Sequence, residues 1–400
     1  MGIIMGLRRI EDADVNGKRV LVRVDFNVPM KDGVVTDATR LMSALPTISH
    51  LKSAGAKVIL LAHFGRPKGQ RVAEASLMPV VAPLADMLAA PVEFADDCVG
   101  PAAKAAIDAL EAGGVLLLEN TRFHAGEETN DPDFAAELAK LGDLFVNDAF
   151  SAAHRAHGST AGIADLLPAY AGLAMQRELD HLSQALRDPK RPVIAIVGGA
   201  KVSTKIALLE NLVTKVDKLF VGGAMANTFL AAQGHDVGKS LYEDDFADTA
   251  RTIMEAARNH GCEMILPEDL VCAREFKPNP ETSTVPVDAI PADMMALDCG
   301  PATVDGLADS IDACRTLIWN GPLGAFETPP FDTSTVEAAK YAGARARENN
   351  LIAVAGGGDT VAALNQAGAS SDFTFISTAG GAFLEWMEGK TLPGVEAVTD

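Results

Sequence analysis

Short apolar runs alternate with alanine- and leucine-rich stretches along almost the whole chain. The runs lie at 20–24, 58–62, 115–118 and 144–146 in the first half, and at 193–197, 219–221, 264–266, 317–319, 351–355 and 373–376 in the second. Runs that are apolar at nearly every position are typical of strands covered on both faces. Their alternation with helical stretches predicts βαβ units. We therefore expect an α/β fold in which parallel sheets are flanked by helices.

The segment between the two halves, residues 172–189, predicts a helix. Its leucines recur at helical spacing, at Leu173, Leu179, Leu182 and Leu186. A chain of 400 residues is also too long for one ordinary core. We predict two lobes of similar size joined by a hinge helix: an N-terminal domain over 1–171, the hinge over 172–189, a C-terminal domain over 190–384, and a final segment over 385–400.

Composition excludes several classes of protein. The net charge of −20 argues against a nucleic-acid surface, and no apolar run approaches the ~18 residues of a membrane span. The five cysteines are odd in number and include no C-x-x-C pair, so neither a disulfide framework nor a zinc site is indicated. We expect no signal peptide, because the first residues lack its apolar segment. A reducing cytoplasm is the location that these features favour.

Basic residues follow the four runs of the first half. The carboxyl ends of parallel strands meet at one edge of a sheet, where ligands bind. Arginine suits an anion there, because its planar fork binds phosphate or carboxylate oxygens in pairs and stays charged. The alternatives are separate surface ion pairs and, for the two histidines of the last group, half of a metal site. The groups are Asp25, Asn27 and Arg40; His63 and Arg66; Asn120 and Arg122; and Asn147, Asp148, His154, Arg155 and His157.

Glycines follow five runs of the second half, in GGAKVSTKI, GGAMANTF, NGPLGAFE, GGGDTVAAL and STAGGAFLE. Glycine lets the backbone approach a phosphate, and a helix that opens after it directs N–H groups at the anion. We expect Lys201 and Lys205 on one face of such a helix. Asp359 and Thr360 are expected at a helix N-cap, with Asp359 as a magnesium ligand. The alternative is tight turns that need glycine only for their geometry.

One lobe thus offers arginines to a small polyanion and the other offers helix starts to a nucleotide, which favours phosphoryl transfer. The sequence contains no P-loop, no G-x-G-x-x-G and no G-x-S-x-G, which disfavours a dinucleotide-dependent dehydrogenase. A non-catalytic binding protein for a phosphorylated metabolite would have no use for Lys201 and Asp359. A scaffold that had lost activity would not need to keep Arg40.

These segments resemble those of phosphoglycerate kinases, in the same order and over essentially the whole chain. The resemblance implies reversible phosphoryl transfer between 1,3-bisphosphoglycerate and ADP, giving 3-phosphoglycerate and ATP in glycolysis. It also implies magnesium carried by the nucleotide, a monomer, and a C-terminal segment that packs back on the first lobe. The matching segments are GKRVLVRVDFNVP (17–29), HFGRP (63–67), ENTRFH (119–124), NDAFSAAHRAH (147–157), GGAKVSTKI (198–206), FVGGAMANTF (220–229), WNGPLGAFE (319–327), GGGDT (356–360) and STAGGAFLE (377–385).

The resemblance also implies residue roles. Arg40 and Lys201 are the implied catalytic residues, and Arg122 and Arg155 hold the 3-phosphate. The implied phosphoglycerate site comprises Asp25, Phe26, Asn27, Arg40, His63, Phe64, Gly65, Arg66, Arg122 and Arg155. The implied nucleotide site comprises Lys205, Glu327 at the ribose, and the phosphate loop Gly357, Gly358, Asp359 and Thr360, with Asp359 as the ligand of the nucleotide's magnesium.

Three positions depart from the family's commonest pattern. Ala379 stands where the first of three glycines often follows Ser-Thr, and its methyl group narrows the allowed backbone angles. The backbone conformation at Ala379 therefore decides whether the methyl group disturbs this loop. Phe64 and Thr121 replace aliphatic residues, and we expect differences in packing only.

Overall fold

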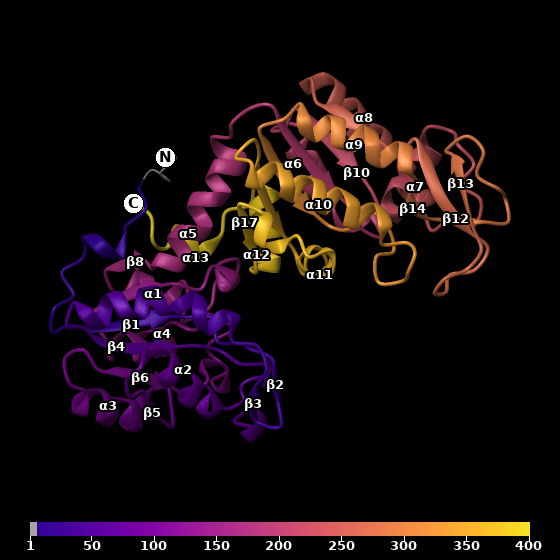
Figure 1. The fold of residues 1–400 in the computed structure, drawn as a ribbon. Coiled ribbons are helices and arrows are strands. Elements are labelled where there is room, and N and C mark those ends of the chain that lie inside the picture. The colour runs from indigo at the N-terminus through magenta and orange to yellow at the C-terminus, as the bar shows by residue number, and fades with distance from the viewer. Residues whose placement is uncertain (1–5) are drawn as a thin grey trace. The chain divides into compact units, whose positions relative to one another are not determined.

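The structure is a computed structural model that describes residues 6–400, so the first five residues of the expected N-terminal domain lie outside it. The chain forms two compact units, each with its own sheet (Figure 1). We call residues 6–180 together with Thr391–Asp400 the N-unit, and His181–Lys390 the C-unit. The chain thus passes between units within the segment 172–189, and again after Lys390.

The N-unit contains a parallel six-stranded sheet in the order β5-β6-β4-β1-β7-β8. The two central strands β1 and β4 are buried at four of their five positions, which explains the continuous apolar runs. All four strands predicted in this half are confirmed, whereas β5 and β8 were too short to predict from a pattern. The strands are β1 (Arg19–Arg23), β4 (Lys57–Leu61), β5 (Glu93–Ala95), β6 (Val115–Leu118), β7 (Leu144–Asn147) and β8 (Ala169–Ala171).

Helices α1 (Thr39–Ser53) and α2 (Val81–Leu88) share one core with the alternate β1 residues Val20 and Val22. Helix α3 (Gly100–Ala109) lies beside β5 and β6, and α4 (Pro132–Ala139) begins at an Asp131 cap. A small hairpin follows β1. The remaining short elements are β2 (Met30–Lys31), β3 (Val34–Val35), η1 (Ile10–Asp12), η2 (Ala73–Ala75), η3 (Met78–Val80), η4 (Thr121–Phe123), η5 (Phe150–Ala152) and η6 (Gly162–Asp165).

The helix predicted for 172–189 is present as α5 (Leu173–Leu182), which continues into the π-helical segment η7 (Ser183–Arg187). Asp148, which follows β7, caps α5: its Oδ1 accepts hydrogen bonds from the amides of Ala174 (2.8 Å) and Met175 (3.2 Å). The C-terminal helix α13 (Pro393–Glu396) lies within the N-unit, where the Gly394 amide donates to the Ala153 carbonyl at 2.8 Å. The turn after β7 therefore anchors both segments.

The C-unit contains a second parallel six-stranded sheet, in the order β11-β10-β9-β15-β16-β17. Each of its strands coincides with a predicted run. A three-stranded antiparallel sheet, β13-β12-β14, was not predicted. The strands are β9 (Val193–Val197), β10 (Lys218–Val221), β11 (Glu263–Ile265), β12 (Asp269–Ala273), β13 (Thr282–Pro286), β14 (Met295–Cys299), β15 (Thr316–Asn320), β16 (Ile352–Gly356) and β17 (Phe375–Ser377).

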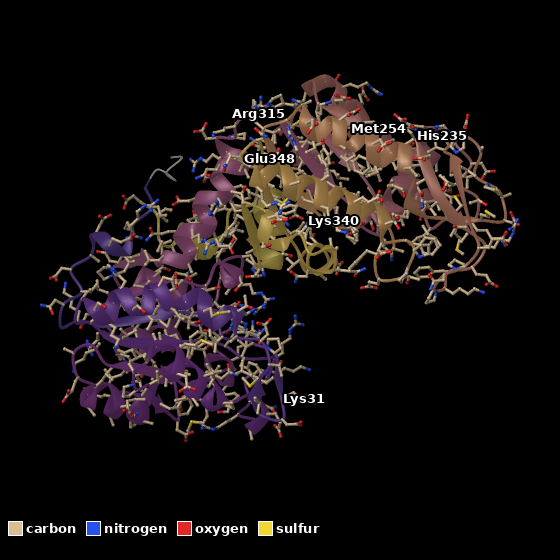
Figure 2. The ribbon with its side chains drawn as sticks, in the orientation of Figure 1. Lys31, His235, Met254, Arg315, Lys340 and Glu348 are labelled. Atoms are coloured by element: carbon tan, nitrogen blue, oxygen red, sulfur yellow. The ribbon has the colours of Figure 1, made fainter. Side chains whose placement is uncertain are left out.

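Two groups of helices accompany this sheet. Helices α9 (Pro301–Asp312), α10 (Thr333–Arg347) and α11 (Gly358–Ala367) share one core with the alternate β9 residues Ile194 and Ile196. The second group is α6 (Ile206–Leu212), α7 (Ala224–Ala232), α8 (Ala247–His260) and α12 (Gly380–Met387), with contacts from α8 to α6 and α7 and from α12 to α6. The buried residues of α8 follow a helical period and include Met254 (Figure 2). The short segments are η8 (Val202–Thr204), η9 (Asp244–Phe246) and η10 (Ser370–Asp372).

Within the described part of the chain, no helix combines the length and apolar character needed to cross a bilayer.

Candidate functional site

The carboxyl ends of four N-unit strands bring basic side chains together. Arg23 ends β1, His63 follows β4, Arg122 lies in η4 after β6, and Arg155 follows η5 beyond β7. Burial, together with the charges of these three arginines, lowers the pKa of His63 well below its ordinary value. The imidazole is therefore neutral near pH 7. We call these four residues together with Arg40 the basic cluster.

Arg40 lies in the first turn of α1 and is held by the β1–α1 connection. Its Nη1 donates to Oδ1 of Asp25 at 3.1 Å and to the carbonyl of Asn27 at 3.0 Å. Ser151 Oγ, from the turn after β7, donates to Oδ2 of Asp25 at 2.5 Å. A third of the Arg40 side chain stays exposed. Asp25 therefore orients a guanidinium whose outer nitrogens remain accessible to a ligand.

The turn after β4 supports Arg122. Gly65 has a φ of +62°, a conformation that glycine adopts without strain, and its carbonyl accepts a hydrogen bond from Arg122 Nη1 at 2.8 Å. Its amide donates to Asn27 Oδ1 at 3.0 Å. Asn120 holds the neighbouring Phe64 at both backbone groups, at 3.2 Å and 2.7 Å. Asn27 and Phe64 thus contribute to the scaffold that shapes this turn.

Two of the predicted site residues, Phe26 and Arg66, have no side-chain part in the hydrogen bonds that brace the basic cluster. Phe26 is fully buried in the core beside α1, so it offers a ligand only its backbone. Arg66 is exposed and forms no hydrogen bond or ion pair with the residues that the structure describes. The alternative of a metal site at His154 and His157 gains no support either. The group of possible metal ligands that lie close together in residues 6–400 is instead Asp97, Cys98 and His124.

Two residues of this region were missed by the sequence analysis: Arg23 and Glu127. Arg23 lies within an apolar strand run, and its side chain is 1% exposed. A charged residue inside such a run was a usable signal, because buried charges need partners. Glu127 is fully buried and follows η4 in a turn. No local pattern marks it, because Ser159, which donates to both of its carboxylate oxygens, lies 32 positions away.

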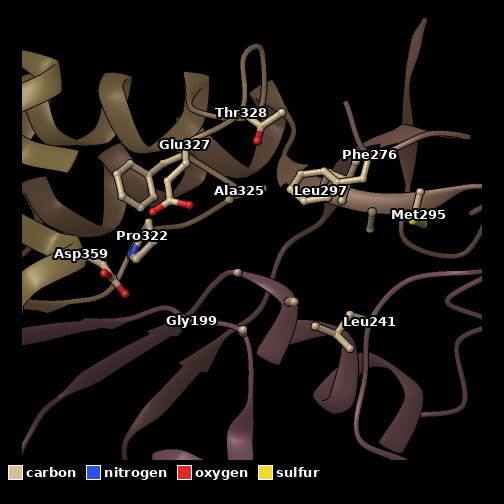
Figure 3. A pocket seen from close by; sticks show the side chains of 16 residues that line it. Gly199, Leu241, Phe276, Met295, Leu297, Pro322, Ala325, Glu327, Thr328 and Asp359 are labelled. Carbon is tan, nitrogen blue, oxygen red and sulfur yellow. The ribbon is translucent and has the colours of Figure 1, made fainter. Parts of the chain in front are cut away.

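The C-unit contains a cavity of about 390 Å³ beside the carboxyl ends of its strands (Figure 3). Leu241, Phe276 and Met295 lie at one end, and the carboxylates of Glu327 and Asp359 lie at the other (Figure 3). A flat apolar group with a polar extension that offers hydroxyls or carries a cation to the carboxylates fits this division of the walls. The lining residues are Gly199, Ala200, Gly223, Ala224, Leu241, Phe276, Met295, Ala296, Leu297, Pro322, Gly324, Ala325, Phe326, Glu327, Thr328 and Asp359.

The glycines near this cavity fall into two kinds. A Cβ on Gly198 would lie 1.8 Å from the Pro322 carbonyl oxygen, and one on Gly321 would lie 2.1 Å from the Gly198 oxygen. These glycines allow close packing of two loops, as the alternative of tight turns predicts. A Cβ on Gly358 or on Gly380 would instead meet no heavy atom within 4 Å. These two positions leave open space at helix starts, as a phosphate site requires.

The expectation that Lys201 and Lys205 share a helix face is wrong. The short turn η8 separates them and α6 begins only at Ile206. Lys201 is extended, with φ −136° and ψ 127°, and Lys205 has φ −131° and ψ 14°, so neither lies in a helix. Lys201 is exposed. Lys205 is partly buried, and its Nζ donates to the Gly198 carbonyl at 2.6 Å and to Asn320 Oδ1 at 2.7 Å. Burial lowers its pKa to about 8.

The expected N-cap at Asp359 and Thr360 is also wrong, because the cap of α11 is Gly357 with a φ of +100°. Asp359 lies in the first turn, exposed at the cavity. The buried Thr360 accepts a hydrogen bond from the Gly321 amide at 2.7 Å through its Oγ1. Thr360 therefore joins the loops after β15 and β16.

Ala379 adopts φ −87° and ψ 14° as the cap of α12. An L-residue takes these angles without left-handed strain, so the methyl group causes no distortion. The positive φ in this loop, +28°, belongs to Gly380. The departure at Ala379 thus leaves the backbone of the helix start intact.

Known proteins resemble this chain over nearly its full length. The family model for phosphoglycerate kinase matches residues 10–390. The phosphoglycerate kinase of Maricaulis maris is 71% identical over 98% of this chain and 97% of its own. That of Caulobacter vibrioides (strain NA1000 / CB15N) is 62% identical over 98% of this chain and 100% of its own.

Two solved structures also match. The structure of phosphoglycerate kinase from Coxiella burnetii is 40% identical, with a TM-score of 0.92 over 98% of both chains. The phosphoglycerate kinase of Pyrococcus horikoshii is 30% identical, with a TM-score of 0.80 and the same coverage.

Proposed function

Since the chain belongs to the phosphoglycerate kinase family, we propose that its basic cluster binds the phosphoglycerate and that its C-unit cavity binds the nucleotide. The reaction is reversible phosphoryl transfer between 1,3-bisphosphoglycerate and ADP, which gives 3-phosphoglycerate and ATP in glycolysis. The observation that carries the assignment is the separation of chemistry between the units. Cationic side chains gather at the carboxyl ends of the N-unit strands. Open helix starts beside apolar walls lie at the carboxyl ends of the C-unit strands.

Arg122 and Arg155 hold the 3-phosphate in this proposal, and His63 donates a further hydrogen bond to the substrate. Arg40 points to the transferring group from its support on Asp25. Asp25, Asn27, Phe64 and Gly65 shape the turns that carry these cations, Phe26 contributes backbone, and the exposed Arg66 supplies positive charge at the entrance. The distances that support this proposal are those that fix Arg40 on Asp25 and Arg122 on Gly65.

In the C-unit, the base lies between the apolar walls at Phe276 and Leu241, with Glu327 at the ribose. The phosphates extend toward Gly357, Gly358, Asp359 and Thr360, where the open space at Gly358 supports a close approach of the backbone. Lys205 lies behind the phosphates and Lys201 beside the transferring group. The ends of the cavity in Figure 3 support this direction of the nucleotide.

The residues present fit a magnesium ion that arrives with the nucleotide. Mg²⁺ prefers oxygen ligands and is bound in nucleotide sites by one or two carboxylates together with phosphate oxygens. Asp359 supplies such a carboxylate, exposed at the cavity. When bound there, the ion neutralises phosphate charge.

Both possible nucleophiles are already anionic: the terminal phosphate oxygen of ADP in one direction, and the carboxylate of 3-phosphoglycerate in the other. The reaction therefore needs no general base. Arg40 and Lys201 neutralise the oxygens of the group in transit, and the backbone N–H groups at Ala379 and Gly380 add hydrogen bonds. In-line transfer requires the reacting atoms at ~3–3.5 Å. Hinge motion around 172–189 brings the two bound substrates together.

We further propose a monomeric cytoplasmic enzyme. The monomer is what the resemblance to the family implies. All five cysteines are free and buried, which is typical of a reducing compartment.

A coupled assay tests the activity. Purified protein is mixed with ATP, Mg²⁺ and 3-phosphoglycerate, and ADP release is followed with each component omitted in turn. We expect turnover only with all three. Turnover that persists without 3-phosphoglycerate but not without ATP would indicate an ATPase and contradict the proposed acceptor.

A further inference from the structure

Arg23 is a buried cation without a direct ionic partner. Its side chain is 1% exposed, and no carboxylate in residues 6–400 forms an ion pair with it. Nε donates to Ser159 Oγ at 2.8 Å, Nη1 to the Val24 carbonyl at 2.5 Å, and Nη2 contacts Nδ1 of His63 at 2.8 Å. A guanidinium in such a position requires a counter-charge nearby, because burial disfavours its charged form.

Glu127 supplies the larger part of that charge, through Ser159, and Asp25 supplies a smaller part. The Ser159 hydroxyl contacts Glu127 Oε1 at 2.5 Å, and the Ser159 amide donates to Oε2 at 2.9 Å. The Thr121 hydroxyl also donates to Oε1, at 3.2 Å. Glu127 is fully buried, and its negative charge favours the charged forms of both Arg23 and Arg122.

The donors and acceptors in this chain have only one arrangement. A hydroxyl has one hydrogen, and an ionised carboxylate can only accept. Ser159 therefore donates to Glu127 and accepts from Arg23. Arginine can only donate, so Nδ1 of His63 must accept from Arg23. A neutral imidazole that accepts at Nδ1 carries its proton at Nε2.

From these contacts we infer that Glu127 is a positioning residue, which acts through Ser159 and Arg23 to hold His63 as an Nε2–H donor for the substrate. Glu127 does not itself touch the substrate. The inference rests on the proposed function, because that proposal places the phosphoglycerate against His63. The inference assigns a role to Glu127, which no sequence pattern marks, and it explains why β1 contains a buried arginine, Arg23.

The Glu127 side chain also has a structural role in this turn, because its Oε2 accepts a hydrogen bond from the Ser159 amide at 2.9 Å. A test must therefore separate loss of the relay from loss of the turn. Glu127→Gln keeps the size of the side chain and removes its charge. Ser159→Ala breaks the relay and leaves Glu127 in place. Thr121→Val is the matched control, because it removes a hydrogen bond to Glu127 without touching Ser159 or Arg23.

The first readout is the ring nitrogen spectrum of His63 in the full-length protein, labelled with ¹⁵N-histidine and assigned with a His63→Gln variant. We expect the wild type and Thr121→Val to show a single Nε2–H tautomer. Glu127→Gln and Ser159→Ala weaken the anchor that holds the Arg23 guanidinium against Nδ1 of His63. The guanidinium then shifts, and the spectrum should show a mixture of the two tautomers. A pure Nε2–H spectrum in both relay variants would overturn the inference.

The second readout is KM for 3-phosphoglycerate against kcat, with thermal melting as a check on folding. One charge-assisted hydrogen bond is worth about tenfold in affinity, so we expect KM to rise about tenfold in both relay variants, with kcat changed less than about threefold. KM values that match the Thr121→Val control would overturn the inference. Arg122→Ala keeps the two proposals apart. If Arg122→Ala binds 3-phosphoglycerate as tightly as the wild type, the proposed phosphoglycerate site is wrong. If Arg122→Ala binds it more weakly but the two relay variants keep the KM of the control, only the role inferred for Glu127 is wrong.

Discussion

The basic cluster of the N-unit and the cavity of the C-unit offer different groups to an anionic ligand. In the N-unit the contacts come from cationic side chains that are braced by hydrogen bonds, such as Arg40 on Asp25 and Arg122 on Gly65. In the C-unit the surroundings are helix starts and apolar walls, with glycines that leave space. A small polyanion offers little surface to bury, so charge must supply its affinity. A nucleotide offers a flat apolar base, so shape supplies much of its affinity.

Arg40→Ala is the substitution with the largest expected effect. The substitution removes the cation that neutralises the phosphoryl group during its transfer. Positioned arginines of this kind contribute about 1,000-fold or more to the rate of phosphoryl transfer. We expect kcat to fall about 1,000-fold while nucleotide affinity changes less than about threefold. The control is Arg71→Ala, which breaks an exposed ion pair with Asp96 elsewhere in the N-unit. Undiminished turnover in Arg40→Ala would contradict its assignment.

Arg122→Ala should act on binding. Two charge-assisted hydrogen bonds to a phosphate are worth ~3 kcal/mol or more. We therefore expect the Kd of 3-phosphoglycerate, measured by titration calorimetry, to rise about 100-fold. The Kd of ADP should stay within about twofold of the wild type, because the cation belongs to the other ligand. A parallel loss of both affinities would mean that the division between the units is wrong.

Gly357→Ala and Gly358→Ala form a matched pair in the C-unit. Gly357 has a φ of +100°, and a Cβ there would lie 2.7 Å from Asn320 Nδ2, whereas a Cβ on Gly358 meets nothing within 4 Å. We expect Gly357→Ala to lower the free energy of unfolding by about 1–3 kcal/mol. Gly358→Ala should leave stability within about 0.5 kcal/mol and weaken ADP binding about tenfold.

Chemical denaturation and ADP titration of the two variants decide the matter. If Gly358→Ala binds ADP normally, the open space at that helix start is not where the phosphates lie.

The smallest expected effect concerns pH. Burial lowers the pKa of Lys205 to about 8 from its ordinary value of 10.5. Between these values the unfolded chain binds more protons at this residue than the native chain, so its contribution to the free energy of unfolding rises with pH. Nucleotide affinity should change in the opposite direction, because the ammonium charge is lost above pH 8.

We expect the Kd of ADP to rise a few-fold between pH 7 and pH 9 in the wild type, since a charge-assisted contact is lost. Lys205→Arg, which stays charged, should have a flatter profile. Profiles of equal slope would show that Lys205 does not titrate in this range.

Much of the fold could be predicted from the sequence, because parallel strands buried on both faces are apolar at nearly every position. All ten predicted strands are present. The antiparallel sheet escaped this reasoning. Its strand β13 alternates between exposed and half-buried positions and includes Pro286, so it has no apolar run. The helix face expected for Lys201 and Lys205 is wrong because the 3-10 turn Val202–Thr204 stands between them and α6 begins after both.

The site was accessible where chemistry follows a strand end, as at His63 and Arg122. It was hidden where function depends on contacts distant in sequence. Asn320 holds Lys205 from 115 positions away, and Glu127 reaches Arg23 only through Ser159. Such residues have no local sequence pattern, because only folding brings them into contact with their partners.

The most direct test of the account is a crystal structure of the protein with 3-phosphoglycerate and a magnesium nucleotide. The account predicts that the 3-phosphate contacts Arg122 and Arg155 and that the base lies between Leu241 and Phe276, with the nucleotide phosphates at Gly358. A phosphoglycerate bound away from the basic cluster, or a base outside the apolar end of the cavity, would contradict it.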